Sequence, residues 1–319
     1  MGLSRYPNGV ISFGNVVHAG FGIGNVYNVC QPSNSVVYSD VVQRYGAERY
    51  SNDGSNMFHT EIQKALDATV ASRNDYVVVW GDGSDYDLTE PLTMTKKGVH
   101  LICPAGLSMD GGMGANACRI EQTTAGEPII TSTADCIEVA GFFFKGMADS
   151  PIITLSGTRW HNYIHNNFLG GKTTAGAAIY QIYGDGHVWH SAIVDNFIMA
   201  GYAPAANKTI SGCIGFTSGS SGRNLIKGNT ICTGGQTVVT AGVKLAGTND
   251  MMVRNIFHET IATLLAAGTF TKAWDTSAST IFIKNEVAMD TPAMSGGTVN
   301  NSHVENWSAT AGNTIIEAS

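Results

Sequence analysis

Short apolar stretches alternate with turns rich in Gly, Asn and Ser from about residue 57 to the C-terminus. Residues 160–169 and 189–198 both read W-H-x-x-I-x-x-N-F followed by an aliphatic residue, and they begin 29 residues apart (189 − 160). Looser copies that keep the strand and its Asn follow at spacings of 33, 26, 30 and 21 residues (229 − 196, 255 − 229, 285 − 255, 306 − 285). Self-similarity at a period of about 20–50 residues is typical of stacked repeats. Because the units are short and alternate apolar with polar residues, they predict an all-β solenoid of parallel coils.

One Asn in each copy stands where the apolar strand ends. A sharp corner between two strands requires a left-handed residue, a conformation that Gly and then Asn tolerate best. Amide side chains at equivalent corners of coils stacked about 4.8 Å apart can also hydrogen-bond along the column. We therefore predict a structural column that starts at Gly141 and continues with Asn167, Asn196, Asn229, Asn255, Asn285 and Asn306.

An amphipathic helix is predicted over residues 59–70, ahead of the repeats. Its apolar residues recur at i, i+3, i+4, i+7 and i+8 and form one face: Ile62, Ala65, Leu66, Thr69 and Val70. Residues 1–56 show no such period, and we assign them to an N-terminal arm that serves as a docking segment. The β-helix domain is predicted over residues 57–319.

The composition narrows the class of protein. Of the 319 residues, 43% are hydrophobic and only 13% are charged, which suits a large core. A net charge of −7 and the lack of any basic run argue against nucleic-acid binding. The sequence has no apolar run of about 18 residues and no signal-peptide core, so we expect neither a membrane span nor signal-directed secretion. Six cysteines without a C-x-x-C motif are expected to be free thiols, most of them buried.

The segments IQKALDA, DYVVVW, DYDLTEPLTM and KGVHLI resemble, in this order, the N-terminal cap of the pectate-lyase-like β-helix superfamily. The later segment IEVAGFFFKG is similar to a coil strand of the same superfamily. The resemblance implies a right-handed single-stranded parallel β-helix with an N-terminal capping α-helix. Members include polysaccharide lyases, glycosidases, phage tailspikes and other virion proteins, so the fold leaves the activity open.

A second resemblance concerns the N-terminal part of the chain. The segments ISFGNV, VVQRYGAERY and LTMTKKGVHLI look like those of uncharacterised virion structural proteins of tailed bacteriophages. This resemblance implies a protein of the phage particle and carries no catalytic residue with it.

No catalytic, cofactor-binding or metal-binding residue is predicted. Hydrolysis of a glycan needs two carboxylates about 5–9.5 Å apart, which neighbouring coils would have to supply at matching positions. The N-T-D, D-D, G-H-G and R-I-K motifs of polygalacturonases do not occur. Asp195 is expected to stack on Asn166 and Gly228, and the other acids of the repeats stand alone: Asp185, Asp250, Glu259, Asp275, Glu286, Asp290 and Glu305.

The two Trp-His pairs are the candidate contact site. Equivalent positions place Trp160 over Trp189 and His161 over His190. Three interpretations remain open: an aromatic stack packed against a loop or another subunit, a sugar-stacking strip, and a histidine metal site completed by His165 or His187.

Two functional hypotheses follow, and the first is favoured. The chain is a non-catalytic virion structural protein, a capsid decoration or tail-associated protein assembled in the host cytoplasm. It acts as a homotrimer, docks on capsid or tail proteins through residues 1–56 and needs no cofactor. The alternative is a tailspike-like depolymerase, either glycoside hydrolase or lyase, or a glycan-binding adhesin, with a host surface glycan as ligand.

Overall fold

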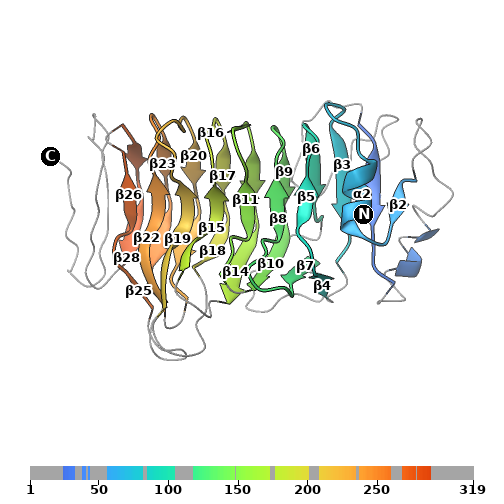
Figure 1. The fold of residues 1–319 in the computed structure, drawn as a ribbon, viewed down its shortest axis with the longest axis horizontal. Helices are drawn as coiled ribbons and strands as arrows, with labels where there is room; N and C mark the ends of the chain where they lie inside the picture. The colour runs from blue at the N-terminus through green and yellow to red at the C-terminus, as the bar shows by residue number, and fades with distance from the viewer. Residues whose placement is uncertain are drawn as a thin grey trace.

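The structure is a computed structural model, and it describes residues 24–32, 38–40, 42–43, 56–81, 85–104, 118–147, 149–172, 177–200, 208–234, 237–259, 268–277 and 279–288. The described strands form three long parallel sheets and one short one. Figure 1 shows the strands stacked along the long axis of the molecule, with α2 near the N-terminal end.

Sheet I has ten strands in the order β2 (Phe58–His59), β1 (Val26–Val29), β3 (Asp75–Val79), β6 (Val99–Ile102), β9 (Glu138–Ala140), β13 (Tyr163–His165), β17 (Ala192–Val194), β20 (Leu225–Lys227), β23 (Met251–Val253) and β27 (Ile281–Ile283). Sheet II has eight, in the order β4 (Asp85–Leu88), β7 (Cys118–Gln122), β10 (Phe142–Met147), β14 (Phe168–Lys172), β18 (Phe197–Met199), β21 (Thr230–Cys232), β24 (Ile256–His258) and β28 (Glu286–Ala288).

Sheet III also has eight strands. Seven lie along its path, in the order β5 (Leu92–Met94), β8 (Ile130–Ser132), β11 (Ile153–Leu155), β15 (Ala177–Gly184), β19 (Lys208–Phe216), β22 (Thr237–Leu245) and β25 (Thr269–Phe270). The eighth, β26 (Trp274–Thr276), lies off this path and pairs with β22. A two-stranded sheet joins β12 (Arg159–Trp160) to β16 (Val188–Trp189).

Each coil runs through sheet III, then sheet I, then sheet II, and the next coil repeats the path. The strands β15, β17 and β18 form one coil, and β19, β20 and β21 form the next, paired in parallel at every step. The fold is a right-handed parallel β-helix, as the sequence predicts; right-handed crossovers are the rule between parallel strands.

The core is one continuous cluster of inward-facing side chains. Alternate residues of a strand point to opposite faces, so a three-residue strand sends its central side chain inward. In sheet I the central residues Ile164, Ile193 and Ile226 occupy the same register of successive coils and are fully buried. Stacking like residues in this way lets one core grow along the axis without limit.

The helix α2 (Ile62–Ala68) packs Ile62, Ala65 and Leu66 into this core. It is shorter than predicted, because His59 belongs to β2 instead. The domain boundary also needs a correction. Strand β1 lies inside the predicted arm, yet it pairs with β2 and β3 and belongs to sheet I. Residues 1–23 and 44–55 of the arm lie outside the described residues.

Two left-handed positions flank the strand of sheet I in the five coils from β9 to β23. The corner before the strand holds Cys136, His161, His190, Arg223 and Asn249, and the corner after it holds Gly141, Asn166, Asp195, Gly228, Arg254 and Lys284, all at positive φ. The prediction that the column asparagines take this conformation is wrong, because the left-handed residue comes one position earlier. Gly141 therefore aligns with Asn166, and Phe142 occupies the place that was predicted for Gly141.

All six cysteines are free, and all but Cys136 are buried, as expected from the sequence. Burial raises the pKa of Cys213 well above its usual value and that of Cys232 to about 12, so both thiols are unreactive core groups. Among the described residues, no helix is long and apolar enough to cross a membrane.

Candidate functional site: corner ladders, an aromatic platform and a buried ionic triad

Five of the six predicted column asparagines lie in one file and hydrogen-bond from coil to coil. The amide Nδ2 of each donates to the Oδ1 of the next, at 3.1, 3.0, 3.0 and 2.9 Å along Asn167, Asn196, Asn229, Asn255 and Asn285. The same Oδ1 atoms accept the backbone N–H of the preceding Asn. All five are buried, so this Asn ladder is structural, and Asn306 lies outside the described residues.

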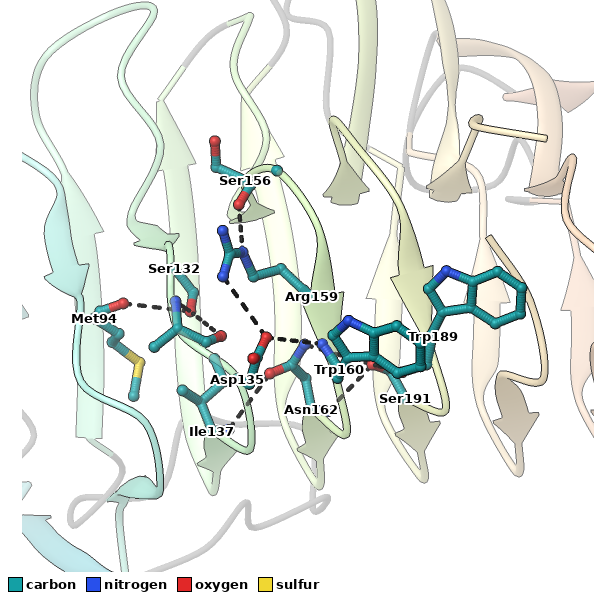
Figure 2. Close-up of polar contacts among 12 residues, drawn as sticks. Met94, Ser132, Asp135, Ile137, Ser156, Arg159, Trp160, Asn162, Trp189 and Ser191 are labelled. Carbon is teal, nitrogen blue, oxygen red and sulfur yellow. Dashed lines mark hydrogen bonds and ion pairs between the residues drawn. The ribbon is translucent and has the colours of Figure 1, made fainter. Parts of the chain in front are cut away.

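A second ladder, which the sequence analysis missed, runs along the other corner of sheet I. Asn162 N–H donates to Ser191 Oγ at 3.1 Å, Ser191 N–H to Asn224 Oδ1 at 3.0 Å, and Asn224 N–H to Asp250 Oδ1 at 2.8 Å. Figure 2 shows its first members, from Ile137 through Asn162 to Ser191. The coils that contain β13, β17, β20 and β23 thus have a left-handed residue and then a buried ladder residue on both sides of the sheet I strand.

Asp250 ends the second ladder as a buried acid. Its Oδ1 accepts from Asn224 N–H and Nδ2, while its Oδ2 has no partner among the described residues. Burial raises the pKa of Asp250 from 3.8 to about 6, although the two bonds from Asn224 act in the opposite direction. The chain therefore holds a buried, titratable carboxyl group at the corner before β23.

The Trp-His pairs meet as predicted by their register and form a flat aromatic platform of Trp160, Trp189, His161 and His190. The indole centroids are 5.6 Å apart with an interplanar angle of 14°, and the imidazoles are 5.2 Å apart. Figure 2 shows the indoles side by side along the axis, each with its ring face visible. Trp160 is 39% exposed, so the platform offers apolar ring surface to solvent.

Polar groups border this platform. The backbone N–H of Trp160 donates to Asp135 Oδ1 at 3.0 Å, and the Arg159 guanidinium lies 3.6 Å from the same carboxylate (Figure 2). Asp185 accepts from Ser156 Oγ at 2.7 Å and from Gly157 N–H at 2.5 Å. The two histidines that could have completed a metal site lie elsewhere: His187 contacts Ser218 Oγ at 2.6 Å, and His165 contacts Glu138 Oε1 at 2.7 Å. The histidines therefore do not converge on one point.

The acids considered for catalysis serve the turns. Asp185 bridges two coils, and Glu259 accepts the backbone N–H of Phe270 at 2.7 Å. Asp195 lies over Gly228, where a Cβ would stand 2.0 Å from its Oδ1. The three carboxylates come from different corners of the coils, and no pair of them forms the site that a glycosidase requires.

An acidic cluster that the sequence interpretation did not name begins at Asp85-Tyr86-Asp87. In the structure Asp85, Asp87 and Glu121 bring carboxylate oxygens within 4.8 Å of one another on the outer face of sheet II. Arg119 contacts Asp85 at 2.7 Å, and Lys145 contacts both Asp85 and Glu121. Burial alone would lower the pKa of Lys145, but its bonds to the two carboxylates raise it. The cluster is therefore an ion-paired network, largely neutralised by its own cations.

A buried carboxylate between two imidazoles was also missed. Glu138 Oε2 is 2.6 Å from His100 Nδ1, and its Oε1 is 2.7 Å from His165 Nε2. Since a carboxylate only accepts, both rings donate to it. Tyr76 stacks on His100 at 4.3 Å and Tyr163 on His165 at 3.9 Å. Burial, together with the charge of Glu138, raises the pKa of both tyrosines. The triad joins β6, β9 and β13.

Replacing Glu138 by Gln is expected to lower the free energy of unfolding by about 1–3 kcal/mol. The amide keeps one acceptor oxygen, so one of the two buried ring N–H groups loses its partner. Urea unfolding at pH 7 would measure the loss. Glu90→Gln is the control, because Glu90 is exposed in the turn between β4 and β5 and its neutralisation should change stability little. Equal stability of the two variants would contradict a structural role for the triad.

No protein-family model and no curated protein matches the chain. Among solved structures, ORF18 of Geobacillus virus E2 matches with 13% identity and a TM-score of 0.43, over 88% of this chain and 65% of that protein, less than two thirds of its length. The pectate lyase Pel9A matches with 11% identity and a TM-score of 0.43, over 90% of this chain and 80% of the lyase. By its own three parallel sheets, the chain is a parallel β-helix. Neither likeness bears on its activity.

Proposed function

We propose that the chain is a structural protein of a bacteriophage particle and acts by assembly rather than by chemistry. The observation that carries the proposal is that the polar side chains at the corners of the coils are taken up by structural hydrogen bonds. At both corners of sheet I they are buried in coil-to-coil ladders, and Asp185 and Glu259 accept backbone N–H groups of Gly157 and Phe270. Such a stack is a stiff rod, because each coil is bonded to the next in three sheets and at two corners.

The proposal is tested on purified phage particles from a strain that encodes the chain. Mass spectrometry of density-purified particles should find the chain at a fixed copy number, and immunogold labelling should place it on the head or on the tail. Residues 1–56 are the proposed docking segment, although strand β1 within it belongs to sheet I. A chain that begins at residue 24 keeps β1 and should fail to join particles. Recovery of the chain only from the lysate, with none in purified particles, would overturn the proposal.

The aromatic platform favours a second candidate function, a glycan-binding adhesin. Outward-facing indoles offer the apolar surface on which sugar rings stack, and Asp135 and Arg159 supply polar groups beside it. A host surface glycan would be the ligand. This role is compatible with a place in the particle, and it requires no bond cleavage.

Replacing both Trp160 and Trp189 by Ala is expected to weaken binding to such a glycan at least tenfold, as measured on immobilised host polysaccharide. Val70→Ala is the control, because Val70 is 42% exposed on another part of the molecule. Unchanged binding of the double variant would show that the aromatic platform is not the glycan-binding site. Release of reducing ends or unsaturated uronates from the polysaccharide by the wild type would instead establish a depolymerase.

A further inference from the structure

The outer face of sheet I is apolar in its C-terminal coils. In β17, β20, β23 and β27 the central residue points into the core, so the first and third residues point outward. Seven of these eight outward positions are apolar, and Lys227 is the exception: Ala192, Val194, Leu225, Lys227, Met251, Val253, Ile281 and Ile283. A sheet face in water is expected to carry polar residues there, so this face is built to be covered.

The apolar surface continues around the corner that carries the Asn ladder. Ile256 is the first residue of β24 in sheet II and is 41% exposed, while Met251 and Ile281 on sheet I are 36% and 38% exposed. Only Arg254 and Asn255 separate the strands β23 and β24. We name this surface the apolar corner: Leu225, Met251, Val253, Ile281 and Ile283 on sheet I and Ile256 on sheet II.

Charges of opposite sign border the two sides of the apolar corner. Arg254 and Lys284 are exposed at its edge, and Lys227 stands on the sheet I side. Glu286 pairs in register with Ile256 on the sheet II side and is exposed as well. None of these four side chains forms an ion pair within the described part of the chain. A second copy that set its sheet II side against this sheet I side would supply Glu286 to the lysines and the arginine.

We infer that the apolar corner is the contact between copies of this chain, with the sheet I side of one copy against the sheet II side of the next. In a ring of three parallel rods whose edges face the rotation axis, each copy sets its sheet I side against the sheet II side of the next, so the contact is heterologous and the ring closes. The expected ring is a trimer of parallel rods. The inference rests on the proposed assembly function and names its partner as a second copy.

Light scattering tests the assembly with the full chain, whose mass is 33.7 kDa. The wild type should have three times this mass. Each charge placed in the contact, by Met251→Asp with Ile281→Asp or by Ile256→Asp, should weaken association at least about tenfold. Val70→Asp is the matched control and should leave the trimer intact. A monomeric wild type, or corner variants that remain trimeric, would overturn the inference.

Mixing the two kinds of variant separates this arrangement from a symmetric face-to-face contact. The Met251→Asp/Ile281→Asp chain keeps its sheet II side, and the Ile256→Asp chain keeps its sheet I side, so the mixture should form a one-to-one dimer that neither chain forms alone. No dimer in the mixture would rule out the heterologous contact. Circular dichroism confirms folding of each variant. A monomeric chain that is nevertheless found in particles would refute this contact and leave the proposed function standing.

Discussion

Replacing Asn229 by Ala is expected to lower the free energy of unfolding by about 3–5 kcal/mol. Asn229 is fully buried in the middle of the Asn ladder. Its Nδ2 donates to Ile193 O at 2.9 Å and to Asn255 Oδ1 at 3.0 Å, and its Oδ1 accepts from Asn196 N–H and Nδ2, both at 3.0 Å. Alanine removes all four bonds and leaves the buried Asn196 N–H without its acceptor.

The matched control is Asn166→Gly. Asn166 is exposed at the same corner two coils before Asn229, at φ 53°, so glycine keeps the left-handed backbone without strain and removes one contact, to His165. Its expected cost is below about 1 kcal/mol. Urea unfolding followed by circular dichroism compares the two variants. Equal losses would mean that corner asparagines act through backbone conformation rather than through the ladder.

The sequence predicts the Asn ladder because its chemistry repeats. Each Asn follows an apolar strand at the same offset, so Asn167 and Asn196 can be aligned by eye. The role of each corner residue was harder to assign. Asn tolerates a left-handed backbone, and its amide can also hydrogen-bond along a column. The sequence therefore allowed one Asn to fill both the left-handed position and the ladder position. The structure divides them, since Asp195 and Arg254 take the left-handed positions and the asparagines behind them make the ladder.

The second ladder was not predicted from the sequence because its members are different types of residue. Asn162, Ser191, Asn224 and Asp250 share only a side-chain oxygen that accepts a backbone N–H from the coil before. The turns that precede them also vary in length between coils, which blurs the period on this side of the strand. Which residues occupy equivalent ladder positions depends on the register of the sheet I strands, and this register is seen only in the three-dimensional structure.

The ionic triad could not be predicted for a different reason. His100, Glu138 and His165 lie 38 and 27 residues apart (138 − 100, 165 − 138) and come from coils whose sequences do not match. Glu138 reads as an ordinary outward residue of a strand, because nothing local marks it as 5% exposed. Packing of the two imidazoles and the two tyrosines over one carboxylate requires the register of β3, β6, β9 and β13 together.

Replacing Asp250 by Asn is expected to raise the free energy of unfolding at pH 7.5 by about 2–3 kcal/mol. Burial raises the pKa of Asp250 from 3.8 to about 6 in the folded chain, and each pKa unit corresponds to about 1.4 kcal/mol. The amide keeps Oδ1 as the acceptor for Asn224 and replaces the unpartnered Oδ2 with a neutral donor. Its position matches that of Asn224 in the coil before, whose Nδ2 donates to Val188 O.

The pH dependence tests the same cause. Below pH 3.8 both states of the wild type hold the proton, so the group contributes no difference. Between pH 3.8 and about 6 the folded chain keeps a proton that the unfolded chain has released, so this contribution to stability falls as the pH rises and levels off above 6. Unfolding midpoints of wild type and Asp250→Asn should therefore converge near pH 4 and separate by pH 7. Asp185→Asn, at an exposed acid, should follow the wild-type profile. Parallel profiles for wild type and Asp250→Asn would show that Asp250 is ionised at little cost, and the ladder would then end in a solvated carboxylate.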